Sequence, residues 1–168
     1  MGKKKKETIN KKDNSKIVNT CIIIGIVFLI GSLVLMFTDN GKKSYIKSIS
    51  YSEYADKIKE DKYTIILLTS PTCSHCVNYK PSVNYVAGEY NLEVYDINLN
   101  NLSLEEYNDI HNKYNAIKGE FDSNGNPVIP TPVTIIVKNG EEVASTLGEI
   151  GTEGFLRFLK NNGVIKAD

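Results

Sequence analysis

The 168-residue sequence has few of the side chains that hold metals, with only three cysteines and two histidines. A structural zinc site needs four ligands. Outside the long apolar segment near the N-terminus, the candidates are Cys73, His75, Cys76 and the distant His111. We therefore expect no metal site, and we expect no cofactor.

The sequence also lacks an excess of charge, because 20 basic side chains balance 20 acidic ones. Seven lysines but only Glu7 and Asp13 lie in residues 1–16, which leaves 13 basic and 18 acidic side chains after residue 37. A net acidic region excludes the basic patch that nucleic-acid binding requires. We expect no nucleic-acid partner.

One long apolar run is present, at residues 17–37, and it contains no charged side chain. A helix of this length, at about 1.5 Å per residue, crosses a hydrocarbon core of about 30 Å. A buried core helix rarely runs so far without a polar face. The apolar core of a cleaved signal peptide is usually shorter, at about 7 to 15 residues, and no small-residue cleavage site follows Phe37. We predict an uncleaved transmembrane helix, in which Cys21 is a small hydrophobic residue.

The lysine-rich arm sets the orientation of this helix. Cytoplasmic flanks of membrane helices carry an excess of lysine and arginine, so residues 1–16 are expected in the cytoplasm and the chain after Phe37 outside it. Residues 38–44 read as a polar linker before a domain at 45–168. The simple anchor and the lysine-, asparagine- and isoleucine-rich composition favour the plasma membrane of a bacterium without an outer membrane. An endoplasmic-reticulum membrane protein of the same orientation is the alternative.

Strand and helix patterns alternate after residue 44, without an internal repeat. Ser50 with Glu53, and Ser103 with Glu106, have the spacing of capping boxes, and Asn139-Gly140 is a hairpin turn signal. The expected strands and helices are, in order, 45–49, 50–61, 63–69, 73–90, 92–97, 103–114, 133–137, 142–146 and a last helix capped by Thr152. The order β-α-β-α-β-α-β-β-α predicts an α/β sandwich with a hairpin at its edge.

Cys73 and Cys76 lie three positions apart, directly after the apolar run at 63–69. A disulfide that closes so small a loop constrains the unfolded chain very little, which argues against a purely structural bond. A cysteine in the first turn of a helix faces free backbone N–H groups that favour its thiolate. Redox chemistry is then the remaining use, with Cys73 attacking and Cys76 resolving the mixed disulfide. His75 could donate a hydrogen bond or a positive charge to the Cys73 thiolate.

Five features in one order resemble the thioredoxin-like family, over about residues 45 to 165. The CxxC pair begins a helix after a buried strand, and Pro81 lies eight residues after Cys73. Thr131-Pro132-Val133-Thr134, the turn Lys138-Asn139-Gly140-Glu141 and Gly148 follow in the family's order. The resemblance implies a thioredoxin fold, a central mixed β-sheet flanked by helices, which here would be preceded by one N-terminal transmembrane helix.

The resemblance also implies roles for individual residues. Cys73 resembles the nucleophile and Cys76 the resolving cysteine. Pro132 resembles the cis-proline beside the disulfide, and Thr131 before it would offer backbone groups to a substrate peptide. Pro130 competes for the proline position, but counting back from the turn at Lys138 favours Pro132.

The sequence departs from the family pattern at three places. Thr72 replaces a tryptophan common before the first cysteine, and Leu67 replaces the buried aspartate that serves cytoplasmic thioredoxins as proton acceptor. The Ser74-His75 pair between the cysteines is similar to the CPHC site of periplasmic disulfide oxidases, whose large helical insertion is absent. These departures leave the direction of electron flow open.

The expected function is a membrane-anchored, extracytoplasmic thiol-disulfide oxidoreductase that acts on cysteines of exported proteins. One transmembrane helix cannot relay electrons across a bilayer, so a separate membrane redox partner is expected. The alternative is a non-catalytic accessory protein that uses a thioredoxin-like surface to dock a membrane transport system.

Overall fold

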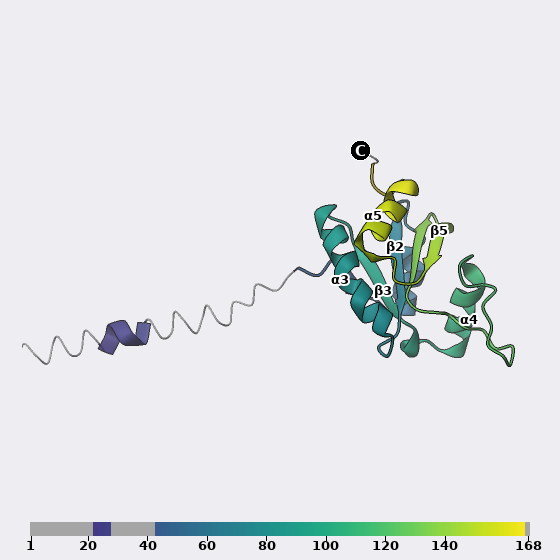
Figure 1. Ribbon diagram of the computed structural model, residues 1–168, viewed down its shortest axis with the longest axis horizontal. Helices are drawn as coiled ribbons and strands as arrows, with labels where there is room; N and C mark the ends of the chain where they lie inside the picture. The colour runs from purple at the N-terminus through teal and green to yellow at the C-terminus, as the bar shows by residue number, and fades with distance from the viewer. Residues whose placement is uncertain (1–21, 28–42, 167–168) are drawn as a thin grey trace, which may run out of the picture. The chain divides into compact units, whose positions relative to one another are not determined.

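The computed structural model of the chain describes residues 22–27 and 43–166. Strands and helices alternate through the second range (Figure 1) in the predicted order, with one added 3-10 turn, η1. The elements are β1 (Ile46–Ser48), α2 (Tyr51–Lys57), β2 (Thr64–Thr69), α3 (Ser74–Glu89), β3 (Val94–Asn98), η1 (Leu99–Asn101), α4 (Leu104–Lys113), β4 (Val133–Lys138), β5 (Glu141–Leu147) and α5 (Gly151–Asn161).

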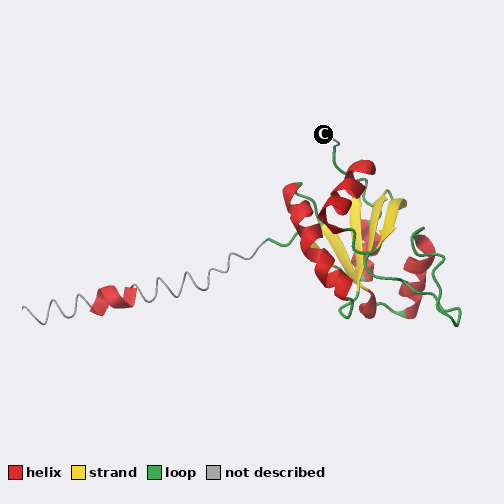
Figure 2. Cartoon of the chain, in the orientation of Figure 1, coloured by secondary structure: helices red, strands yellow, loops and turns green. Residues whose placement is uncertain are grey.

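The five strands form one mixed sheet in the order β1-β3-β2-β4-β5, between two layers of helices (Figure 2). β1, β3 and β2 are parallel, whereas β4 runs antiparallel to both β2 and β5. The turn between β4 and β5 is formed by Asn139 and Gly140, both with positive φ, which confirms the predicted edge hairpin. The mixed sheet with helices on both faces agrees with the predicted fold.

All six residues of β2 are buried, as a strand in the middle of a covered sheet requires. Ile65 and Leu67 pack in the core beneath α3 and α5, while Ile66 and Leu68 pack in the core on the α2 and α4 side. The alternation follows from the two-residue period of a strand. Each core therefore receives half of the side chains of the central strand.

Two predicted helix boundaries were wrong. α2 ends at Lys57 instead of Asp61, because the next carbonyls are taken by the hairpin turn: the N–H groups of Gly140 and Asn139 donate to residues 58 and 60. α5 begins at Gly151 after Ile150, which makes no side-chain cap, so Thr152 is not the cap. Both capping boxes were predicted correctly, with Ser50 and Ser103 preceding α2 and α4.

The two edges of the sheet are different in kind. β1 has only three residues. β5 begins with Glu141 and Glu142, and the segment after α4 lies alongside part of it. Glu142 Oε2 accepts a hydrogen bond of 2.8 Å from the Asn115 N–H, and Ser145 Oγ accepts one of 3.0 Å from the Ala116 N–H. Short length at one edge and charge with coverage at the other limit free strand pairing.

Most of the predicted transmembrane helix at 17–37 lies outside the described residues, as do the basic arm at 1–16 and most of the linker at 38–44. Within the predicted helix, residues 22–27 are helical, with exposed side chains. Among the residues that the structure describes, no helix has the length and apolar character needed to cross a membrane.

A pair of tyrosines joins α2 to the end of α4. The hydroxyls of Tyr54 and Tyr114 are 2.5 Å apart, and both side chains are at most 1% exposed. Burial raises the pKa of each hydroxyl, so both stay protonated and each is the other's hydrogen-bond partner. The pair places a polar contact inside an otherwise apolar core.

We expect Tyr114→Phe to lower the free energy of unfolding by about 1–3 kcal/mol, because it leaves the buried Tyr54 hydroxyl without its partner. The double variant with Tyr54→Phe should lose less than the sum of the two single losses, since both partners are then removed. Urea-induced unfolding of the purified full chain measures these differences.

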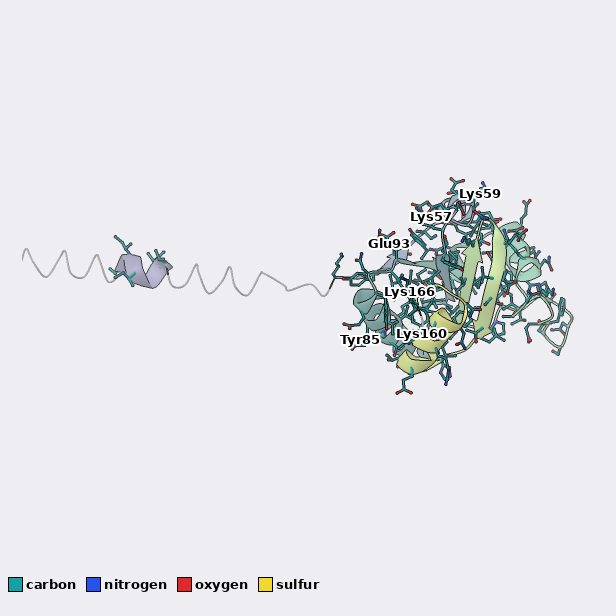
Figure 3. The ribbon with its side chains drawn as sticks, turned by 90° about the horizontal axis from the view of Figure 1, so that it is seen from above. Lys57, Lys59, Tyr85, Glu93, Lys160 and Lys166 are labelled. Carbon is teal, nitrogen blue, oxygen red and sulfur yellow. A yellow bond between two sulfur atoms is a disulfide. The ribbon has the colours of Figure 1, made fainter. Side chains whose placement is uncertain are left out.

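Tyr85 offers a matched control, because it projects from the outer side of α3 (Figure 3) and is 61% exposed. Tyr85→Phe should change the unfolding free energy by less than about 0.5 kcal/mol. Additive losses in the double variant would contradict the pairing of Tyr54 with Tyr114.

Candidate functional site

Cys73 occupies the cap position of α3, immediately after the turn that follows β2. Its backbone is extended (φ −85°, ψ 107°), and its Sγ accepts a hydrogen bond of 3.0 Å from the Cys76 N–H. The sulfur thus takes the place of the oxygen that usually caps a helix. The first turn of α3 contains no acidic side chain, so the helix dipole and this N–H favour negative charge on Cys73.

Cys73 and Cys76 are joined by a disulfide, with their Cα atoms 5.3 Å apart. Cys73 is partly exposed, whereas Cys76 is 2% exposed. A thiol from another protein can therefore approach the sulfur of Cys73 and not that of Cys76. The difference in access supports the predicted division into attacking and resolving cysteines.

The loop before β4 lies next to the disulfide, at Cys73. The peptide bond between Thr131 and Pro132 is cis, and no other described residue has a cis peptide bond. Pro132, and not Pro130, is therefore the cis-proline. The Thr131 carbonyl oxygen lies 3.5 Å from Cys73 Sγ. The Pro132 carbonyl accepts a hydrogen bond of 2.8 Å from the N–H of Gly148, whose φ is +85°. The structure thus brings the Thr131 end of this cis peptide bond to Cys73.

His75 is placed differently from the expectation. Its side chain is 72% exposed, and its Nδ1 lies 3.1 Å from Oε2 of Glu149, in the segment between β5 and α5. The hydrogen bond that the structure gives to the imidazole is thus with Glu149, and not with Cys73. Any effect of His75 on the Cys73 thiolate must act through space, against the opposing charge of Glu149. Sequence reasoning missed Glu149, for which the one available signal was the adjacent Gly148.

An ion pair between the buried Asp96 and the half-exposed Lys80 was also missed. Asp96 on β3 is 6% exposed, and its carboxylate accepts hydrogen bonds of 2.7 Å from Thr69 Oγ1 and of 2.7 Å from Lys80 Nζ. Asp96, Lys80 and Thr69 line a cavity of about 210 Å³ together with Cys76. The available signal was Asp96 itself, which stands between Tyr95 and Ile97 in the strand predicted at 92–97.

Tyr79 connects α3 to the sheet and to α5. Its hydroxyl lies 3.2 Å from Thr134 Oγ1 on β4, and its ring packs edge-on against Phe155, with centroids 6.2 Å apart. Burial raises the pKa of Tyr79 to about 12, so the side chain remains neutral at physiological pH. Tyr79 therefore fixes α3 on the sheet and adds no charge to the site.

His111 lies away from the cysteines. Its Nε2 is 2.8 Å from the Glu120 carbonyl oxygen, and its ring packs against Phe121. Within residues 22–27 and 43–166, no three side chains of the metal-binding types come together. The groups that the structure describes at the site are the disulfide, the Thr131–Pro132 loop and the Asp96–Lys80 pair.

No protein-family model matches the sequence, and no curated protein matches it. Solved structures do. The chain is similar to thioredoxin f2 of Chlamydomonas reinhardtii, with a TM-score of 0.56 and 11% identity, over 72% of this chain and 99% of that one. It is also similar to Fasciola hepatica thioredoxin, with a TM-score of 0.52 and 15% identity, over 69% of this chain and 98% of that one. The domain that begins near residue 43 has the thioredoxin fold.

We expect the two cysteines to differ in reactivity once the disulfide is reduced. In a Cys21→Ser background, iodoacetamide at mildly acidic pH should alkylate Cys73 at least about tenfold faster than Cys76, because only Cys73 is accessible and stabilised as a thiolate. Peptide mass spectrometry of the full chain measures the two rates. Unfolding in urea should remove the difference, and equal rates in the folded chain would contradict the assignment.

Proposed function

We propose that this chain is a thiol-disulfide oxidoreductase, anchored in a membrane, that acts outside the cytoplasm on cysteines of exported proteins. The observation that carries the proposal is the Cys73–Cys76 disulfide at the N-terminus of α3, with one accessible sulfur beside the Thr131–Pro132 loop. The fold and this pair support the chemistry. The sequence pattern before residue 43 supports the location.

The geometry allows one exchange sequence, which can run in either direction. A substrate thiolate attacks Cys73 Sγ, the Cys73–Cys76 bond breaks, and Cys76 takes the electron pair as a thiolate. A second substrate thiolate then attacks the substrate sulfur of the mixed disulfide, and Cys73 leaves as the stabilised thiolate. The substrate has lost two electrons to the cysteine pair. In reverse, Cys73 attacks a substrate disulfide and Cys76 resolves the intermediate.

The proposed location rests on residues 1–37. The uncharged segment at 17–37 has the length of a membrane span, and the seven lysines before it favour a cytoplasmic N-terminus. The thioredoxin-fold domain would then lie outside a bacterial plasma membrane, or in the lumen of an endoplasmic reticulum. A separate membrane protein would exchange electrons with the Cys73–Cys76 pair, because one anchoring helix offers no redox group.

Cys76→Ala should trap substrates in cells that express the full chain, because the mixed disulfide on Cys73 can no longer be resolved. Non-reducing gels followed by mass spectrometry should reveal exported proteins bound through Cys73, and reductant should release them. The variant that also carries Cys73→Ala should trap none.

Trapped cytosolic proteins would contradict the proposed location. An absence of trapped proteins, together with no insulin reduction and no thiol oxidation by the unmutated chain, would contradict the proposed activity. A docking protein for a membrane transport system is the alternative, and full function of a Cys73→Ser/Cys76→Ser strain would favour it.

The direction of electron flow depends on how well the Cys73 thiolate is stabilised. His75→Ala should make the reduction potential of the pair more negative, because it removes a side chain that can supply positive charge near that thiolate. Glu149→Gln should make it less negative, because it removes an opposing anion. We expect each shift to be at most roughly 30 mV, since the imidazole is exposed and solvent screens it. Equilibration with glutathione buffers measures both variants, and shifts of the same sign would contradict this account.

A further inference from the structure

The chain enters the described domain at the end opposite the two cysteines. Ile46 of β1 and Ile65 of β2 both pair with Val94 of β3, so the parallel strands begin at the same end, next to Lys43. Cys73 follows the other end of β2, and a strand of six residues is about 20 Å long. The point of entry and the reactive sulfur are therefore separated by the length of a strand.

Contacts between distant segments hold this end together. The N–H groups of Asn139 and Gly140, in the turn between β4 and β5, donate hydrogen bonds to the carbonyls of residues 60 and 58. Gly163, after α5, lies against the Tyr63 hydroxyl. We define the entry end by the segments that meet here, which are residues 43–47, 56–63, 89–93, 138–141 and 160–166.

Charge is distributed unevenly over the domain. The entry end contains eight lysines and six carboxylates, whereas the rest of residues 43–166 contains four basic side chains and ten acidic ones. The entry end thus has an excess of positive charge, and the part with the cysteines has an excess of negative charge. Such a distribution orients a domain near a charged surface. The lysines, several of which are labelled in Figure 3, are Lys43, Lys47, Lys57, Lys59, Lys62, Lys138, Lys160 and Lys166.

Three of these lysines are not neutralised by a described carboxylate. Within residues 22–27 and 43–166, Lys43, Lys138 and Lys166 form no ion pair. Instead, Lys43 Nζ lies 4.9 Å from the centre of the Tyr45 ring, and Lys138 Nζ lies 4.9 Å from the centre of the Tyr63 ring. A lysine whose stem packs on an apolar surface keeps its ammonium group in water. These cations are therefore available to an anion outside the domain.

A hollow of about 460 Å³ at the entry end adds further cations. It is lined by Lys43, Lys47 and Lys62, with the carboxylate of Glu93 and the hydroxyl of Ser44. Ammonium and hydroxyl groups donate hydrogen bonds to phosphate oxygens, and those from a cation are the stronger ones. Three cations against one carboxylate suit a ligand that bears a phosphate group.

The short tether brings this end to the lipid surface, and the inference rests on the proposed membrane anchor. The predicted helix ends at Phe37, and the six peptide units from there to Lys43 reach at most about 22 Å. The entry point is fixed to α3, because the Tyr45 N–H donates a hydrogen bond of 2.7 Å to Asn84 Oδ1 and the Tyr45 ring lies against Gly88. A tether this short keeps the lysines at high effective concentration near the headgroups.

We propose that the entry end docks on the headgroups of anionic phospholipids in the anchoring membrane. Lys43, Lys138 and Lys166 meet the lipid phosphates, together with the lysines of the hollow. Each lysine close to an anionic surface favours docking by roughly fivefold. The acidic remainder of the domain is repelled by the same surface, so Cys73 faces away from the bilayer, where exported chains reach it.

Acetylation of lysines in the full chain, held in lipid nanodiscs, tests the proposal, because mass spectrometry reports each lysine separately. Discs of phosphatidylcholine are compared with discs of equal parts phosphatidylcholine and phosphatidylglycerol. We expect Lys43, Lys138 and Lys166 to react at least about fivefold more slowly in the anionic discs, and about 1 M salt should remove the difference. Lys80, near Cys76, should react equally in both discs.

Two double variants show which end is responsible. Lys43→Glu with Lys138→Glu should remove most of the protection of Lys166, because the docking charge is reversed. Lys113→Glu with Lys118→Glu is the matched control, since it changes the net charge equally outside the entry end, and Lys113 also lies over a tyrosine ring. This control should keep the protection of Lys166, and both variants should keep the disulfide exchange activity.

Equal acetylation in both kinds of disc, or protection that salt does not remove, would overturn the inference. Protection of Lys80 in place of Lys43 would show that the wrong end was assigned. Protection by inorganic phosphate in phosphatidylcholine discs would assign the surface to a soluble anion and overturn the assignment to lipid. Extraction of the full chain from vesicles by alkaline carbonate would instead contradict the proposed anchor, and the inference would fall with it.

Discussion

The burial of β2 is the constraint on which the site depends. The strand has a hydrogen-bonded neighbour on each edge and helices over each face, and a slip of one residue would exchange the side chains of the two cores. Its register is therefore fixed, and so is the point at which it ends. Leu68 pairs with Val133, which places Pro132 beside the end of β2, where the turn to Cys73 begins. The two halves of the site meet because neighbouring strand ends meet.

The two cysteines share one bond but occupy different environments. Cys73 is partly exposed at the N-terminus of α3, which favours its thiolate after reduction, whereas Cys76 lies on the buried side of α3 and lines a cavity with Asp96 and Lys80. The first environment favours a good nucleophile and leaving group, and the second hides a sulfur from other proteins. An order of events is built into this difference, because the accessible sulfur must react before the buried one can.

The sequence predicted most of the fold and the centre of the site. Periodicity located β2, and the capping boxes located the starts of α2 and α4, because these signals are local. The end of α2 was not predictable, since it is set by hydrogen bonds to a hairpin turn about 80 residues away along the chain. Asp96 with Lys80, and His75 with Glu149, were missed for the same reason. Each pair joins separate elements, and only the three-dimensional arrangement brings the two side chains together.

Both edges of the sheet are built in a way that suits the proposed role, because neither offers a long, free strand for pairing. A protein that exchanges disulfides with unfolded chains meets exposed, strand-forming segments, and an open sheet edge would pair with them. Here one edge strand is only three residues long, and the other carries adjacent glutamates and is partly bonded to the segment after α4. In the proposed role, the domain would hold a substrate protein by a single covalent bond without pairing with its strands.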